Sequence, residues 1–247
     1  MPIVALVLAL AGCADNSDRG FQGWVEADLI FVSPDESGRV ETLSVREGDP
    51  VQQDAPLFTV DSELQRDSVA MAEAALTNAR QAFERAQTLA KTAAGTQKTL
   101  EDAEAALRTA EARLATALTR LARRKASSPV TGTVQQIYYR PGEQVPAGRP
   151  VVALLPPGNI KIRFFVPEAV LPKITLGQAV SIHCDGCKAP VPAKVTFISR
   201  TTEFTPPVIY SQDERSKLVF LIEARTETPG ELRVGQPVDV KVAEAGQ

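Results

Sequence analysis

The stretch GRVETLSVREGDPV, residues 38–51, returns 94 positions later as GTVQQIYYRPGEQV, residues 132–145. Each copy has alternating apolar residues, a glycine-centred turn and a second apolar run, LFTV at 57–60 or VVALL at 151–155. The matched pairs are Gly38 and Gly132, Val40 and Val134, Leu43 and Ile137, Arg46 and Arg140, Gly48 and Gly142, Val51 and Val145, and Pro56 and Pro150. Alternation bounded by Gly and Pro predicts short strands. Each copy has half a core, so two copies are expected to close one β-sandwich.

An alanine-rich and charged segment, residues 61–125, separates the two copies and has a single glycine, Gly95. Both halves of the segment repeat an apolar residue every seven positions, followed three positions later by alanine. These seam residues are Val69, Ala72, Leu76, Ala79, Phe83, Ala86, Ala90 and Ala93, then Leu100, Ala103, Leu107, Ala110, Leu114, Ala117 and Leu121. Such a seam predicts an antiparallel coiled-coil hairpin with its tip near 93–96. Gly95 is predicted as the left-handed residue that ends the first helix, and Thr96 as the N-cap of the second.

The C-terminal third, residues 157–243, changes to strand-like runs separated by Gly, Pro and charged turns. The runs are IKIRFFV (160–166), AVSIHC (179–184), AKVTFIS (193–199), KLVFLIEA (217–224) and PVDVKV (237–242). They predict a small β-barrel. The expected fold class is therefore α+β and multidomain. Its parts are a signal and tether (1–22), a split β domain opened by Trp24 (23–60 plus 126–156), the hairpin (61–125), the barrel (157–243) and a tail (244–247).

The N-terminus, MPIVALVLALAGC, has an apolar run at 3–12 that is too short for a spanning helix of about 20 residues. The run ends in LAGC, which resembles the lipobox of bacterial lipoproteins. That resemblance implies cleavage before Cys13 and a lipid on Cys13. The alternatives are a plain secretory signal, or an apolar N-terminus with an unrelated cysteine. A lipoprotein signal and a plain secretory signal both place the mature chain outside the cytoplasm.

Composition excludes several classes of function. The net charge is −3 and the pI is near 5.4, which argues against a nucleic-acid partner. Aromatic residues make up 5% of the chain, so a deep apolar substrate pocket is not expected. His183 is the only histidine, which excludes a multi-histidine metal site. We expect neither catalysis nor a cofactor.

The split β repeat around a helical hairpin resembles the periplasmic adaptor proteins, or membrane fusion proteins, of the haemolysin D type, whose split domain is biotinyl/lipoyl-like. The resemblance covers about residues 23–243. It implies a link between an inner-membrane exporter and a TolC-like outer-membrane channel, and a ring that often has six copies. A lipid anchor on Cys13 would hold the protein at a membrane, expected to be the inner one. Residues 203–220 resemble the subgroup that partners ABC-type exporters.

Channel-binding adaptors carry Arg, three residues, Leu, six residues and Ser across the hairpin tip. Arg85, Leu89 and Thr96 have this spacing, with Thr in place of Ser. The resemblance implies that these three residues dock the channel. The alternative is a solvated charge, an apolar residue at the seam edge and a helix cap, in a scaffolding lipoprotein that binds another coiled-coil protein. A carboxylase or acyl carrier is disfavoured, because 23–60 and 126–160 have no lysine to modify.

The motif CDGC contains Cys184 and Cys187. Asp-Gly predicts a type I′ hairpin turn, which would place the two cysteines opposite each other and within reach of a disulfide. An oxidising compartment favours that disulfide. A metal site with His183, a thioredoxin-like redox pair and free thiols are the alternatives.

Overall fold

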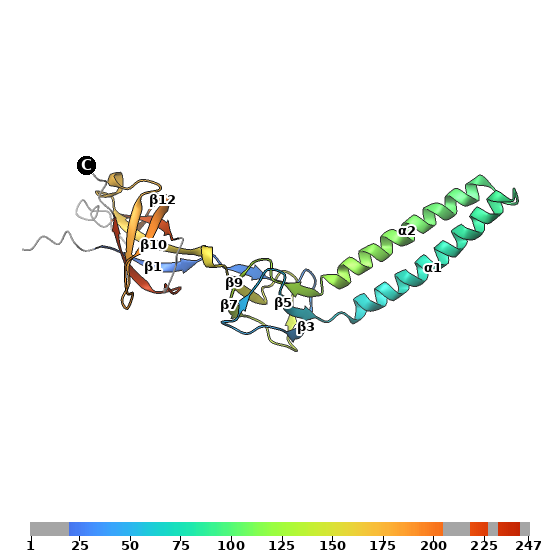
Figure 1. Cartoon of the computed structure of the whole chain (residues 1–247), viewed down its shortest axis with the longest axis horizontal. Coiled ribbons are helices and arrows are strands. Elements are labelled where there is room, and N and C mark those ends of the chain that lie inside the picture. Colours follow the sequence, from blue (N-terminus) through green and yellow to red (C-terminus); the bar gives the residue numbers. More distant parts are fainter. Residues whose placement is uncertain (1–19, 205–217, 227–231, 243–247) are drawn as a thin grey trace, which may run out of the picture. The chain divides into compact units, whose positions relative to one another are not determined.

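The structure is a computed structural model that describes residues 20–204, 218–226 and 232–242 (Figure 1). The chain divides into a barrel unit, residues 1–28 and 158–247, and a sheet-and-hairpin unit, residues 29–157. Several predicted features lie outside the described residues. They are nearly all of the signal and tether including Cys13, most of 203–220, and the tail at 244–247. Among the described helices, none is both long and apolar enough to cross a membrane.

The barrel unit is a closed barrel of six antiparallel strands in the order β1-β10-β13-β12-β11-β14. The strands are β1 (Phe21–Ala27), β10 (Ile160–Pro167), β11 (Ala179–His183), β12 (Val191–Phe204), β13 (Leu218–Arg225) and β14 (Pro237–Val242). Two short 3-10 helices, η2 (Pro157–Asn159) and η3 (Leu171–Lys173), precede and follow β10. Alternate side chains fill the interior, among them Val25, Ile162, Phe164, Ile182, Ile222 and Val240, all at most 1% exposed. The five predicted strands and the barrel are confirmed.

The sixth barrel strand is β1, whose residues were predicted to belong to the split β domain. Trp24 was expected to open the split β domain, but it pairs with Arg163 of β10 and with Pro237 of β14. Its ring lies 5.5 Å from that of Phe165. Gly23 allows β1 to lie tightly against β10, because a Cβ at this position would lie 2.7 Å from the Cβ of Phe164. The barrel therefore closes with a strand from before the repeat, and the split β domain begins after it.

Charged side chains on β1, β10 and β13 form a network on the barrel with Asp28, the residue directly after β1. The ion pairs are Lys161 with Asp28 (2.8 Å) and Glu223 (3.4 Å), Arg163 with Glu26 (3.0 Å) and Glu223 (3.6 Å), and Arg225 with Asp28 (2.7 Å). The hydrogen bond from Lys161 lowers the pKa of Asp28 below its ordinary value of 3.8, and the Arg225 guanidinium lowers it further, although partial burial opposes this. The bond to Asp28 in turn raises the pKa of Lys161. The network thus stabilises the barrel while Asp28 is ionised.

Asp28→Asn is expected to lower the unfolding free energy of the barrel at pH 7 by about 0.5–1 kcal/mol, a small value because Asp28 is 45% exposed. The folded-state pKa is lowered, so this contribution exists above about pH 4 and is lost as the pH falls through that pKa. Urea unfolding followed by the fluorescence of Trp24, the only tryptophan, measures it. Asp239→Asn, an exposed position without an ion pair among the described residues, is the control. An equal effect of Asp28→Asn at pH 7 and pH 2 would contradict the network.

The sheet-and-hairpin unit contains two four-stranded sheets. One has the order β2-β9-β7-β4 and the other β6-β5-β3-β8. The first is built from β2 (Ile30–Val32), β9 (Val152–Leu155), β7 (Gly132–Ile137) and β4 (Pro50–Val51). The second is built from β6 (Lys125–Ser127), β5 (Pro56–Val60), β3 (Gly38–Leu43) and β8 (Gln144–Val145). Each sheet therefore takes two strands from each side of the helical insert, and exchanging the two copies converts one sheet order into the other.

The two copies are also tied by matched hydrogen bonds. The N–H of Gly48 donates to the C=O of Val134, and the N–H of Gly142 donates to the C=O of Val40, each at 2.8 Å. Both glycines have a left-handed backbone, with φ of +92° and +95°. A side chain would strain that backbone, which explains why the glycine recurs at this turn. The gapless alignment of the copies is confirmed in three dimensions.

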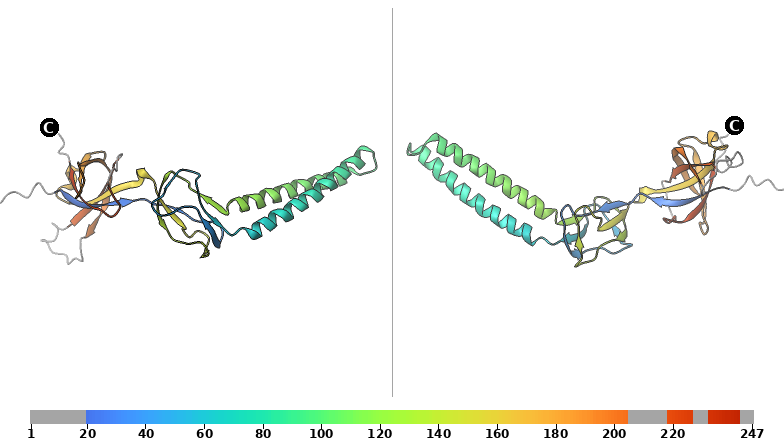
Figure 2. Two further views of the ribbon diagram at one scale, coloured as in Figure 1. Left: turned by 60° about the horizontal axis from the view of Figure 1, so that its bottom comes forward. Right: turned by 180° about the vertical axis from the view of Figure 1, so that it is seen from behind.

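Two helices leave the sheets, α1 (Glu63–Lys91) and α2 (Gln97–Ala122). Figures 1 and 2 show them side by side and running in opposite directions. Every seam residue within the two helices is buried or half-buried, and Val69, Ala86 and Ala110 are the most buried at 7–9% exposure. The heptad prediction is confirmed. The predicted end of the hairpin, residue 125, lies too far along the chain, because Lys125 already belongs to β6.

Candidate docking site at the hairpin tip

The hairpin tip is organised around the carbonyl of Leu89. The backbone N–H groups of Ala94 and Gly95 both donate to it, at 2.9 and 3.0 Å. The hydroxyl of Thr92 donates to the same oxygen at 3.1 Å. Three donors therefore fix the backbone of Leu89 at the end of α1.

The left-handed residue of the tip is Ala93, with φ of +57°, and not Gly95 as the sequence predicted. Gly95 has another role, because a Cβ there would lie 3.0 Å from the Cβ of Leu89. Its lack of a side chain lets the loop fold back against α1. An alanine at position 93 tolerates the left-handed backbone at a cost of about 1 kcal/mol. At position 95, by contrast, any residue with a Cβ would have to displace Leu89, so only glycine fits without a shift. The sequence showed the glycine but gave no sign of which constraint it meets.

Thr96 caps α2, as predicted. Its backbone is extended, and its Oγ1 accepts a hydrogen bond from the N–H of Thr99 at 3.1 Å. The two hydroxyl oxygens, of Thr96 and Thr99, lie 2.7 Å apart. Replacing the expected serine by threonine thus keeps the cap and adds a methyl group at the tip.

Arg85, Leu89 and Thr96 are all exposed, and Leu89 keeps 48% of its surface accessible. Leu89 and Thr96 lie at the end of the hairpin, and Arg85 lies one helical turn below Leu89 on α1. Among the described residues Arg85 has no ion-pair partner within 4.0 Å. The tip therefore presents a cation, an apolar side chain and a hydroxyl to solvent.

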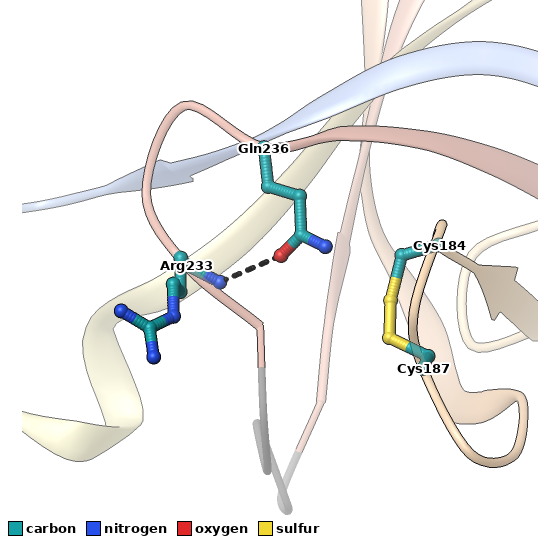
Figure 3. Close-up of a disulfide and its surroundings, with 4 residues drawn as sticks. All are labelled: Cys184, Cys187, Arg233 and Gln236. Atoms are coloured by element: carbon teal, nitrogen blue, oxygen red, sulfur yellow. Dashed lines mark hydrogen bonds between the residues drawn. A yellow bond between two sulfur atoms is a disulfide. The ribbon is translucent and has the colours of Figure 1, made fainter.

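Figure 3 shows the disulfide between Cys184 and Cys187, whose Cα atoms lie 5.4 Å apart. The N–H of Cys187 donates to the C=O of Cys184 at 3.1 Å, so the motif is a tight turn. The turn differs from the predicted type I′, which needs two left-handed residues, because only Gly186 is left-handed, with φ of +86°. Both cysteines follow the end of β11, so they lie outside the paired strands.

The region around the disulfide shows no metal centre. In the described ranges, no group of three or more His, Cys, Asp or Glu residues is arranged to hold a metal ion. The neighbouring turn before β14 is held by the N–H of Arg233, which donates to Oε1 of Gln236 at 3.0 Å (Figure 3). The disulfide thus closes a surface turn of the barrel.

No family model matches the chain. Among curated proteins, a UPF0194 membrane protein in the asrC 5′ region of Acidithiobacillus ferridurans is 32% identical over 117 residues, covering 47% of this chain and 35% of the relative. The UPF0194 membrane protein YbhG of Salmonella newport is 32% identical over 116 residues, with 46% and 35% covered. The matched segment thus spans about a third of the length of these relatives.

Solved structures resemble nearly all of the chain. The membrane fusion protein Spr0693 of Streptococcus pneumoniae has a TM-score of 0.71 at 20% identity, covering 91% of this chain and 98% of that one. A MacA-MexA chimera with the Pseudomonas aeruginosa MexA α-hairpin domain has a TM-score of 0.75 at 22% identity, with 92% and 84% covered. The chain has the fold of these membrane fusion proteins. This is the fold expected from the repeat and the hairpin.

A further solved structure, MacA of Actinobacillus actinomycetemcomitans, has a TM-score of 0.63 at 21% identity, covering 90% of this chain and 77% of that one. At this identity the likeness is one of fold. It extends over both units of the chain, since nine-tenths of the residues are covered.

Proposed function

We propose that the chain is the adaptor subunit of a tripartite efflux or secretion system. In this proposal it links an inner-membrane exporter of the ABC type to a TolC-like outer-membrane channel. Cys13 carries the lipid that anchors the protein to the inner membrane, and several copies, six by family resemblance, form a ring. The adaptor binds and positions its partners and does not catalyse.

The observation that carries this proposal is the exposed tip at the end of an ordered hairpin. Leu89 is held by three hydrogen bonds to its carbonyl, and yet its side chain remains 48% exposed. A surface that is rigid and partly apolar loses little conformational entropy when a partner binds. Arg85 adds a cation that can recognise carbonyl or carboxylate acceptors on the channel. Arg85, Leu89 and Thr96 are therefore proposed as the docking residues.

A photo-crosslink in living cells tests the proposal. The photoreactive residue replaces Ala94 and not Ala93, because a bulky side chain at the left-handed position would strain the tip. We expect a crosslinked band that contains the outer-membrane channel. Arg85→Asp is expected to remove most of this band and to abolish export.

The matched control is Arg80→Asp, which changes an exposed arginine of the same helix on its other side. It is expected to leave the channel band in place. If the probe at Ala94 captures no channel and crosslinks only copies of the chain or an inner-membrane protein, the docking proposal is wrong. The scaffolding role would then be the better account of the hairpin.

A further inference from the structure

A groove of about 470 Å³ lies on the outer face of the barrel, where β1, β14 and β11 lie side by side. Alternate residues of these strands fill the barrel interior, so the residues between them point outward. The pairing of the strands sets Gln22, Asp239 and His183 in one row across this face. Trp24 of β1 and Phe165 of β10 also line the groove. The groove therefore combines aromatic and acidic side chains from neighbouring strands.

Trp24 and Phe165 form the aromatic part of the groove. Their ring centroids lie 5.5 Å apart, and Trp24 is 37% exposed. The guanidinium carbon of Arg163 lies 5.9 Å from the centroid of the Trp24 ring, but Arg163 is not among the residues that line the groove. An aromatic face attracts a cation, and the ring area also receives an apolar chain. This part of the groove thus favours a cation that carries an apolar body.

Two carboxylates give the groove its negative charge. Asp185 and Asp239 line it, both are exposed, and no lysine or arginine is among the lining residues. Within the described ranges, neither side chain takes part in an ion pair. A carboxylate without a fixed counter-charge attracts cationic groups and accepts hydrogen bonds from them. The groove is therefore complementary to a positive charge.

His183 adds a polar group that lacks a partner. Its Nδ1 is buried and has no hydrogen-bond partner among the described residues. Buried polar atoms in folded proteins are nearly always hydrogen-bonded. A ligand with N–H donors satisfies such an atom directly or through a bridging water. This ring nitrogen, in the same groove as two carboxylates, therefore points to a ligand that donates hydrogen bonds.

The disulfide fixes the position of Asp185 at the edge of the groove. Asp185 lies between Cys184 and Cys187, in the turn that the N–H of Cys187 closes with the C=O of Cys184 at 3.1 Å. Figure 3 shows this turn beside the turn at Arg233 and Gln236, where Asp185 and Cys187 line a second hollow. The covalent closure limits the conformations of the turn. Asp185 therefore loses little conformational entropy when a ligand binds.

We propose that this groove binds a small organic cation, a guanidinium or ammonium group on a short apolar body. The cation lies against the carboxylates of Asp185 and Asp239, and the apolar body packs on the rings of Trp24 and Phe165. The volume of the groove falls within the range of small-molecule sites, about 300–1,000 Å³. A bare metal ion fits less well, because no group of three or more His, Cys, Asp or Glu residues in the described ranges is arranged to hold one. The inference does not rest on docking by the tip, which lies in the other unit.

Butylguanidinium, a planar cation on a short alkyl chain, is the probe for this groove. Titrated into the full chain, it is expected to change the fluorescence of Trp24 in a saturable way, because Trp24 lines the groove and is the only tryptophan. Butylurea has nearly the same shape without the charge and is expected to bind at least about tenfold more weakly. Isothermal calorimetry measures both affinities independently of the fluorescence. Equal affinities, or no saturable binding of butylguanidinium, would overturn the proposal.

Single substitutions locate the cation within the barrel. Asp185→Asn and Asp239→Asn are each expected to weaken the binding of butylguanidinium about fivefold and to leave that of butylurea unchanged. Glu168→Gln, which neutralises an exposed carboxylate of the barrel outside the groove, is the matched control. Unchanged affinity in both aspartate variants, or an equal loss in Glu168→Gln, would place the cation elsewhere and overturn the assignment.

Replacement of the disulfide tests the role of its turn. Cys184→Ser combined with Cys187→Ser is expected to weaken the binding of butylguanidinium about fivefold, and to have little further effect once Asp185 is replaced by Asn. Urea unfolding followed by Trp24 fluorescence checks that the double variant is folded. An equal loss with and without the carboxylate of Asp185 would show that the disulfide does not act through this residue.

The N-acetyl methylamide of arginine separates a free ligand from the side chain of a protein partner. It presents the same guanidinium on a peptide backbone, and binding more than about tenfold tighter than that of butylguanidinium would overturn the assignment to a free cation. The tip crosslink from Ala94 separates this inference from the proposed function. A channel band without cation binding contradicts only the groove, whereas cation binding without a channel band contradicts only the docking.

Discussion

Phe58→Ala is expected to lower the unfolding free energy of the sheet-and-hairpin unit by about 3–5 kcal/mol. Phe58 is 1% exposed and lies in β5, next to the start of the hairpin. It belongs to a core that both copies build, with Val40 and Leu57 from the first copy and Val134 and Leu154 from the second. The cavity left by the ring would therefore weaken the contact between the two sheets.

Chemical unfolding followed by helical circular dichroism measures this loss, because both helices belong to the same unit. Trp24 fluorescence does not report it, since Trp24 lies in the barrel unit. Phe31→Ala is the matched control. Phe31 is 53% exposed, so its replacement should change the unfolding free energy by less than about 1 kcal/mol. Equal losses in the two variants would contradict the assigned core.

Arg124→Met is expected to lower the unfolding free energy of the same unit by about 2–3 kcal/mol. Arg124 lies just after α2 and is 9% exposed. Its guanidinium donates to the carboxylate of Glu36 at 2.9 Å and to the C=O of Ser37 at 3.1 Å. Without these donors, the base of the hairpin loses its link to the segment before β3, and the carbonyl of Ser37 is left without this partner.

The neighbouring Arg123 supplies the control for this prediction. It forms an ion pair with Asp35 at 3.2 Å, but both side chains are about 60% exposed. Arg123→Met should therefore change the unfolding free energy by no more than about 0.5 kcal/mol. Chemical unfolding followed by helical circular dichroism compares both variants. A loss for Arg123→Met as large as that for Arg124→Met would show that the burial of the side chain does not decide the loss of unfolding free energy.

Features with a local period were readable from the sequence. The heptads from Val69 to Leu121 predicted the seam because each contact recurs every seven residues, and the spacing of Gly48 and Gly142 predicted two equivalent turns. The strand around Trp24 was also predictable, but its partners were not. They lie in β10 and β14, more than 130 residues away, and alternation along β1 carries no information about which sheet will receive it.

The candidate site also combines features that the sequence predicts with features that it does not. The positions of Leu89 and Thr96 at the tip follow from the helix boundaries, and the cap at Thr96 follows from its residue type. The left-handed turn at Ala93 did not follow, because Gly95 is the residue that such a backbone ordinarily favours. The choice depends on the backbone N–H groups of Ala94 and Gly95, which converge on the carbonyl of Leu89, and backbone hydrogen bonds of this kind leave no mark on side-chain identity.

The pairing of β5 with β6 has a consequence for how such a protein can change in length. Phe58 lies opposite Ala126, so the two strands that lead into and out of the hairpin are fixed side by side. A heptad added to one helix alone would shift the returning strand, whereas a heptad added to each helix would preserve the pairing and raise the tip by about 10 Å. The reach of the hairpin is thus a separately adjustable dimension, which evolution or an engineer can alter in matched steps without redesigning either sheet.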